Sequence, residues 1–224
     1  MALQVQGNGG TIADVDGTAF RALRMTTRPV DHGALGHYRL GVFTGILPAA
    51  LGANSEIFQF RWADATRLCV IQKIRISAAV STTFFAAGVP IQLDLVKSTA
   101  WTVAGTGGTG VTMGATLKQR NSMGSSLLVA GDARIATTAA LGAGTKTLEA
   151  NSIRAIAVAG PITASLNGQI IAPGTELFTA ESGDGEHPLV LVQNEGFSIR
   201  SVAVPATGTW TVGIGVTWVE ATAF

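Results

Sequence analysis

The last strand-like stretch of the chain, residues 209–218, alternates strictly between large apolar and small side chains. One set of alternate positions holds Trp210, Val212, Ile214, Val216 and Trp218. The other set holds Thr209, Thr211, Gly213, Gly215 and Thr217. A period of two is that of a β-strand, whose successive side chains point to opposite faces of a sheet. We expect the Trp/Val/Ile face to fill a core, because a stripe of this size must be buried. The Thr/Gly face offers so little side chain that another surface could approach its backbone closely.

The same alternation recurs along the chain and predicts further half-buried antiparallel strands. It places three sets of apolar residues on common faces: Phe58, Phe60 and Trp62; Val70, Ile74, Ile76 and Val80, with Gln72 interrupting the face; and Ile91, Leu93 and Leu95. Strands without intervening helical patterns are typical of a sandwich or barrel.

We therefore predict an all-β fold, an antiparallel jelly-roll β-sandwich with an N-terminal extended arm and long Gly/Ala/Thr-rich loops. The arm spans residues 1–40, and a single sandwich domain spans residues 41–224. Residues 105–146 are the longest loop region, with one short helix expected over 125–136. An immunoglobulin-type core is excluded, because Cys69 is the only cysteine and that core needs two.

The composition excludes several classes of function. Net charge is +1 and no run of Lys or Arg occurs, which argues against nucleic-acid binding. Apolar runs stop short of the ~20 residues that span a membrane, and the N-terminal segment lacks the pattern of a signal peptide. Charged residues make up 13% of the chain, against roughly 25% in ordinary domains, so we expect other copies or partners to cover much of the surface.

Two short motifs resemble enzyme signatures but lack the required context. The stretch Asp14–Thr18, DVDGT, is interpreted as an Asx-turn rather than a phosphatase nucleophile, because no buried strand precedes it. The glycines of GTGGTG, residues 105–110, are interpreted as a flexible loop, because no βαβ unit surrounds them. The three histidines lack metal-ligand spacing. We predict no enzyme activity, no cofactor and no metal.

Three segments, residues 56–77, 122–148 and 187–220, resemble virion structural proteins of tailed bacteriophages. The resemblance implies a particle component and carries over no catalytic motif. Combined with the jelly-roll prediction, it suggests a capsid decoration (cement) protein on the virion surface, assembled in the cytoplasm of the bacterial host. Its expected partners are the major capsid protein and further copies of itself in a homotrimer, with no membrane or nucleic acid.

Candidate contact residues follow from this hypothesis. The arm arginines Arg21, Arg24 and Arg28 are predicted to face an acidic capsid surface. The subunit interface is predicted to contain Thr211, Gly213, Gly215 and Thr217. An alternative is a tail, baseplate or head-fibre protein that binds a host-surface glycan. Its contacts would be an exposed Trp101 and a polar loop with Asp184 and His187.

Overall fold

A computed structural model describes residues 36–48, 51–83, 85, 91–112, 124–158, 170–180, 187–203 and 207–222. The chain divides into two units, Met1–Asp31 and His32–Phe224, and the first lies outside the described residues. Within the described ranges the regular structure consists of β-strands, and no helix occurs there.

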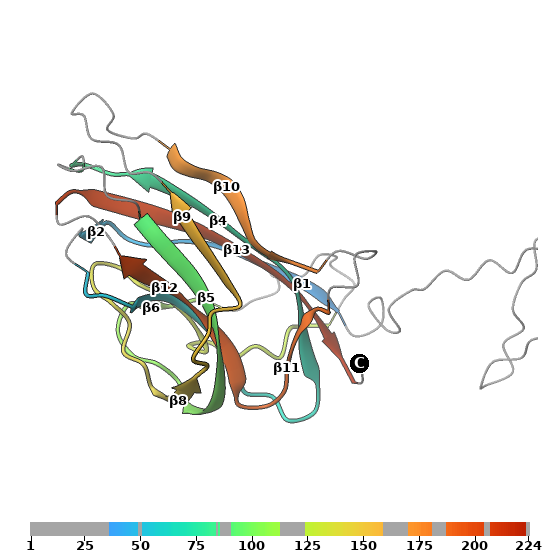
Figure 1. Ribbon diagram of the computed structural model, residues 1–224. Helices are drawn as coiled ribbons and strands as arrows, with labels where there is room; N and C mark the ends of the chain where they lie inside the picture. Colours follow the sequence, from blue (N-terminus) through green and yellow to red (C-terminus); the bar gives the residue numbers. More distant parts are fainter. Residues whose placement is uncertain are drawn as a thin grey trace, which may run out of the picture. The chain divides into compact units, whose positions relative to one another are not determined.

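The strands form two sheets, which Figure 1 shows as two layers. The first sheet contains β1 (His37–Phe43), β2 (Leu47–Pro48), β4 (Leu68–Val80), β10 (Ile170–Thr179), β11 (Leu189–Leu191) and β13 (Thr209–Ala221). The second contains β3 (Ser55–Trp62), β5 (Ile91–Val103), β6 (Thr109–Gly110), β7 (Ala133–Ile135), β8 (Thr145–Leu148), β9 (Arg154–Val158) and β12 (Glu195–Ala203). All pairings between these strands are antiparallel. The predicted all-β antiparallel sandwich is confirmed.

The longer strands pair in a nested order. Among the described residues, eight strands have five or more residues; in chain order they are β1, β3, β4, β5, β9, β10, β12 and β13. The first pairs with the eighth, the second with the seventh, the third with the sixth and the fourth with the fifth. The central strands lie in the orders β1-β13-β4-β10 and β3-β12-β5. The chain thus resembles one long antiparallel hairpin wrapped into two layers.

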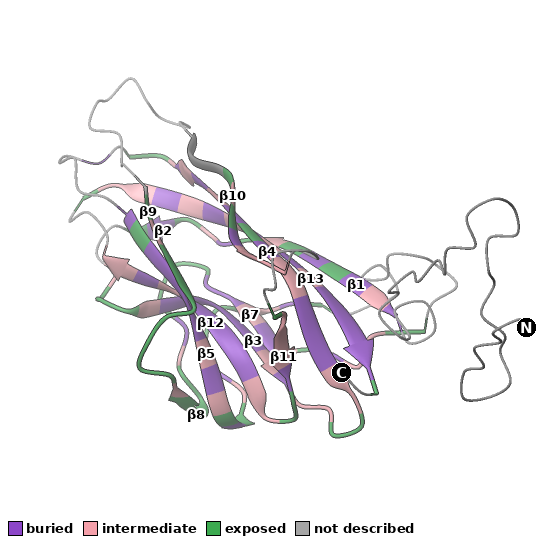
Figure 2. Cartoon of the chain, turned by 45° about the vertical axis from the view of Figure 1, so that its right-hand side comes forward, coloured by how far each residue is buried: buried purple, intermediate pink, exposed green. Residues whose placement is uncertain are grey.

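The core between the sheets consists of the apolar faces that the alternation predicts. The five apolar residues on the alternating face of β13, from Trp210 to Trp218, are at most 2% exposed, and both tryptophans are fully buried. Aromatic rings from the two sheets meet there: Phe60 stacks on Phe197 at 5.1 Å and contacts Trp218 edge-on at 5.5 Å. Figure 2 shows the alternation of buried and partly buried positions along β13. The orientation predicted for this strand is confirmed.

A β-bulge changes which residues of β4 face this core. Thr217 pairs with Lys73 and Trp218 with Ile71, so Gln72 is the extra residue on β4. One extra residue reverses the alternation. Ile71 therefore joins the main core, whereas Val70 packs in a small separate cluster with Val219. The prediction that Val70 shares a face with Ile74 was wrong for this reason.

Two other predictions need correction. The helix expected over 125–136 is absent: Gly131 takes a φ of 92° in a turn, and the following residues form β7, which pairs with β3. The boundary predicted for the arm at residue 40 falls inside a strand, because β1 begins at His37 and pairs with β13 along its length; residues 1–35 lie outside the described residues.

Candidate interaction surface

The Thr/Gly side of β13 forms the outer face of the first sheet. Residues paired across antiparallel strands point to the same face of a sheet. The residues of β1 and β4 that pair with Gly213 and Gly215 therefore lie on this outer face as well. Gly215 lies between Gly41 and Arg75, and Gly213 lies between Phe43 and Ser77. Three glycines in adjacent positions leave the backbone bare at the centre of the sheet.

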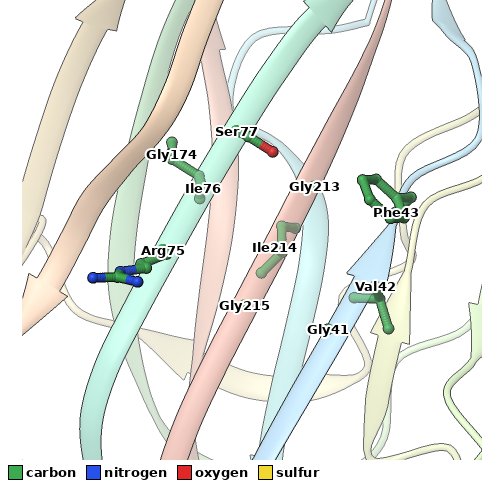
Figure 3. Close-up of a pocket in the computed structure, with 10 residues that line it drawn as sticks. All are labelled: Gly41, Val42, Phe43, Arg75, Ile76, Ser77, Gly174, Gly213, Ile214 and Gly215. Atoms are coloured by element: carbon green, nitrogen blue, oxygen red, sulfur yellow. The ribbon is translucent and has the colours of Figure 1, made fainter.

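This bare region is a shallow groove of about 330 Å³. Figure 3 shows it from the outside, with the Phe43 ring at the end of β1 and Arg75 on the opposite side. A second hollow of about 390 Å³ adjoins it and shares Phe43, Ser77, Gly174 and Gly213 as lining residues. Together the two hollows extend across strands β1, β13, β4 and β10.

Phe43 is the most exposed large apolar side chain in the described ranges, at 77%. Its ring lies over the glycine opposite it, since a Cβ added at Gly213 would come within 2.9 Å of Phe43 Cε1. A ring beside a bare strand covers part of the exposed backbone. The outer surface of Phe43 remains free to contact another molecule.

Charged side chains border the groove on the β10 side. Glu176 pairs with Arg75 at 2.8 Å and also with Lys73. Hydrogen bonds from Lys73 and Arg75 hold the pKa of Glu176 below its usual range. These three side chains are solvent-accessible, and ion pairs in such positions contribute little to stability. They position charge at the groove rather than stabilise the fold.

The described lining of the groove contains few polar side chains. Among its ten described lining residues, the polar side chains are Arg75 and Ser77, so a paired nucleophile and base are missing from this lining.

Elsewhere in the described ranges, no group of three or more His, Cys, Asp or Glu side chains could hold a metal ion. None of the described elements is a helix long and apolar enough to cross a membrane.

The structure brings one predicted set of contact residues together and leaves others undescribed. Thr211, Gly213, Gly215 and Thr217 lie on a single strand face, as the alternation requires. Arg21, Arg24, Arg28 and Asp184 lie outside the described residues. His187 is exposed just before β11.

Trp101, the predicted glycan contact, is only 1% exposed, so the expected exposure was wrong. It lies in β5, and its ring faces the ammonium group of Lys146 at 3.9 Å. Lys146 belongs to β8, which pairs with β5, and this pairing could not be inferred from local sequence.

A buried polar network on the second sheet was missed by the sequence reasoning. It links Glu56, Gln59, Lys146 and Ser198, and a neighbouring group joins Asp94 to Arg200 and Ser152. The polar positions of the strands were visible in the alternation. The burial of these positions could not be predicted, because the residues that hydrogen-bond to Ser198 are 52 residues (Lys146) and 142 residues (Glu56) away in the chain.

Comparison of the chain with protein-family models, with curated proteins and with solved structures found no match.

Proposed function

We propose that the protein is a structural component of a bacteriophage particle: a capsid decoration (cement) protein that forms a homotrimer and binds the major capsid protein. The observation that carries the proposal is the hollowed outer face of the first sheet, with the exposed Phe43 beside a glycine-lined groove. The virion surface is its proposed location, after assembly in the host cytoplasm, and its role is mechanical rather than catalytic.

The nested strand pairing supports a jelly-roll assignment for the sandwich. A jelly roll is a double-sheet fold of eight antiparallel strands, and viral capsid domains use it. The pairing of first with eighth, second with seventh, third with sixth and fourth with fifth strand is what a wrapped hairpin of this kind requires. The fold alone does not imply a function, so the surface has to supply the rest of the argument.

The outer face carries a protrusion and a hollow side by side. Phe43 is the protrusion, and the Gly41–Gly215 pair is the floor of the hollow. In a ring of identical subunits, each copy contacts the next through two different patches. In the proposed trimer, Phe43 of one copy would contact the groove of its neighbour. Burial of one phenylalanine stabilises a contact by about 1.5–3 kcal/mol.

A trimer that binds only the assembled shell would stabilise that shell by mass action. Each trimer that bridges neighbouring capsid subunits adds a modest interface, and simultaneous engagement of several subunits raises the overall affinity. The arm arginines Arg21, Arg24 and Arg28 are proposed as further capsid contacts.

The subunit interface is tested by comparing Phe43→Ser with Val103→Ser. Both residues are exposed, at 77% and 56%, but Val103 belongs to β5 of the other sheet. Sedimentation velocity should show a wild-type trimer, a Phe43→Ser variant shifted toward monomer, and a Val103→Ser variant unchanged. A wild-type monomer at micromolar concentration would contradict the proposed trimer.

The capsid role is tested separately with capsids prepared without the protein. The purified wild-type protein should sediment with these capsids and raise the temperature at which they release DNA. Electron microscopy should place the added density at the local threefold positions of the shell. Density on the tail or baseplate instead would overturn the decoration role while leaving the trimer result intact.

A further inference from the structure

Four buried polar side chains meet on the outward-facing side of the second sheet, beneath the segment that contains β8. They are Glu56 and Gln59 from β3, Ser198 from β12 and Lys146 from β8. Their exposed fractions are small: 6% for Glu56, 1% for Gln59, 0% for Ser198 and 1% for the side chain of Lys146. A bulge at Ile57 brings Glu56 and Gln59 to the same face of β3.

One carboxylate oxygen contacts all of the other three groups. Glu56 Oε2 accepts hydrogen bonds from Gln59 Nε2 at 2.7 Å and from Ser198 Oγ at 2.7 Å, and it forms a short contact with Lys146 Nζ. The amine of Lys146 and the amide nitrogen of Gln59 are therefore held against the same oxygen. Gln59 Nε2 donates hydrogen bonds to Glu56 Oε2 and to the carbonyl oxygen of Gly142. Because only the nitrogen of an amide can donate, these two bonds show which end of the Gln59 amide faces the carboxylate.

Burial limits the access of water to the amine and makes it easier to deprotonate than an exposed lysine. The Trp101 ring covers Lys146 Nζ at 3.9 Å. Burial lowers the pKa of Lys146, although the hydrogen bond to Glu56 opposes that shift. A desolvated lysine paired with a general base is the arrangement of an activated amine nucleophile.

The Gln59 amide is also closely confined. A Cβ at Gly105 would lie 1.9 Å from Gln59 Oε1, so only glycine at that position leaves room for the amide. Gln59 Oε1 itself is buried and lacks a hydrogen-bond partner among the described residues. Gln59 and Lys146 thus share the Glu56 carboxylate, which contacts both the nitrogen that would attack and the nitrogen that would leave.

We propose that Lys146 and Gln59 react to form an intramolecular amide (isopeptide) bond between β8 and β3, with Glu56 as the group that transfers the protons. Lys146 Nζ forms a bond to Gln59 Cδ, and the bond from Cδ to Nε2 breaks. Glu56 first takes a proton from the ammonium group, which frees the lone pair of the amine, and then delivers a proton to the departing nitrogen.

The reaction balances without an oxidant or a co-reactant. Nζ begins with three protons and keeps one in the new amide. Of the two that it loses, one completes the ammonia formed from the Gln59 amide group, and the other converts that ammonia to ammonium. Glu56 returns to its carboxylate form. The bond would link β8 covalently to β3, two strands of the second sheet that do not pair with each other, which suits the mechanical role of the proposed function.

The test is the mass of the intact wild-type protein under denaturing conditions. We expect a mass lower than that of the sequence by one molecule of ammonia. After trypsin digestion, residues 40–61 should remain joined to residues 135–154, because trypsin does not cleave after a modified Lys146. Fragment spectra should place the junction at Gln59 and Lys146.

Three variants distinguish this bond from an ordinary buried ion pair. Lys146→Arg and Glu56→Gln should each retain the full mass, whereas the matched control Lys97→Arg, which alters another partly buried ion pair, should still lose ammonia. An unmodified wild-type mass would overturn the proposal without reference to any variant. It would equally be overturned by a loss of water with the link at Glu56, by a loss of ammonia at another site, or by bond formation in Glu56→Gln.

Discussion

Gly213 and Gly215 lie two residues apart on the same face of β13, but their surroundings differ. A Cβ at Gly213 would approach Ser77 Oγ to 2.6 Å and the Phe43 ring to 2.9 Å. A Cβ at Gly215 would meet Arg75 Cβ at 3.9 Å and the Leu40 carbonyl at 4.0 Å, which is ordinary contact. The missing side chain at Gly213 therefore makes room for Ser77 and Phe43 on the adjacent strands, whereas the space above Gly215 is open.

This difference predicts unequal responses to threonine. Gly215→Thr should raise the free energy of unfolding by about 0.5–1 kcal/mol, because threonine favours a strand and meets no obstacle here. Gly213→Thr should gain less or lose stability, because Ser77 and Phe43 must move. Urea denaturation of both variants measures this, and a Gly213→Thr variant at least as stable as Gly215→Thr would contradict it. Under the proposed function, Gly215→Thr fills the groove and should weaken the trimer even though it stabilises the subunit.

At the scale of elements, Glu220 fastens the segment 124–128 to the end of β13. Its carboxylate is fully buried and accepts hydrogen bonds from Ser126 Oγ at 2.5 Å and from the backbone N–H of Leu127 at 3.0 Å. Trp218 Nε1 lies 3.4 Å away and Arg67 lies 3.8 Å away. Burial raises the pKa of Glu220 even though these hydrogen bonds and the Arg67 charge oppose the shift.

The raised pKa predicts how stability depends on pH. The folded protein holds the Glu220 proton more tightly than the unfolded chain does, so this contribution is complete below the pKa of an ordinary glutamate. It is lost as the pH rises through the folded-state pKa. Relative to Glu220→Gln, the wild-type protein should therefore become less stable as the pH rises above the ordinary pKa of glutamate, about 4.3, as measured by urea unfolding over a series of pH values.

Glu176→Gln supplies a control of opposite sign. The pKa of Glu176 is lowered by its hydrogen bonds to Lys73 and Arg75, so its contribution is present above the ordinary pKa of glutamate and is lost as the pH falls. Relative to Glu176→Gln, the wild-type protein should gain stability as the pH rises. A pH-independent difference between wild type and Glu220→Gln would show that the Glu220 carboxylate does not titrate as described.

At the scale of the whole molecule, the nested pairing places β1 against β13, so the beginning of the described fold depends on its end. Tyr38 and Leu40 of β1 are core residues, and the Tyr38 ring stacks on Trp218 at 5.7 Å. A truncation intended to remove only the arm must therefore stop before His37.

We predict different outcomes for two truncations. Deletion of residues 1–35 should leave the thermal unfolding of the sandwich nearly unchanged and, under the proposed function, reduce capsid binding. Deletion of residues 1–43 should cost about 3 kcal/mol or more, because two core side chains are lost and the edge of β13 is exposed to other chains. Differential scanning calorimetry and light scattering check both, and equal stability of the two truncated proteins would contradict this account of β1.

Individual residues show how much of the structure could be predicted from the sequence. The alternation around Trp210 and Trp218 predicted a buried face correctly, because a strand encodes its two faces in adjacent residues. Val70 was assigned to the wrong cluster, because a bulge at Gln72 reverses the alternation beyond it. The predicted interface glycines share one face, but the contact of Gly213 with Phe43 depends on register between β1 and β13.

The sequence by itself determined that the described chain forms strands with one apolar face, and hence a sandwich of two sheets. That information is local, since each strand carries its own period. The tertiary structure alone decided which strands pair, why Trp101 is buried, and how Glu56 meets Lys146 and Ser198 from 90 and 142 residues away. Those contacts depend on how the whole chain folds, which the residues adjacent to each position in the sequence do not specify.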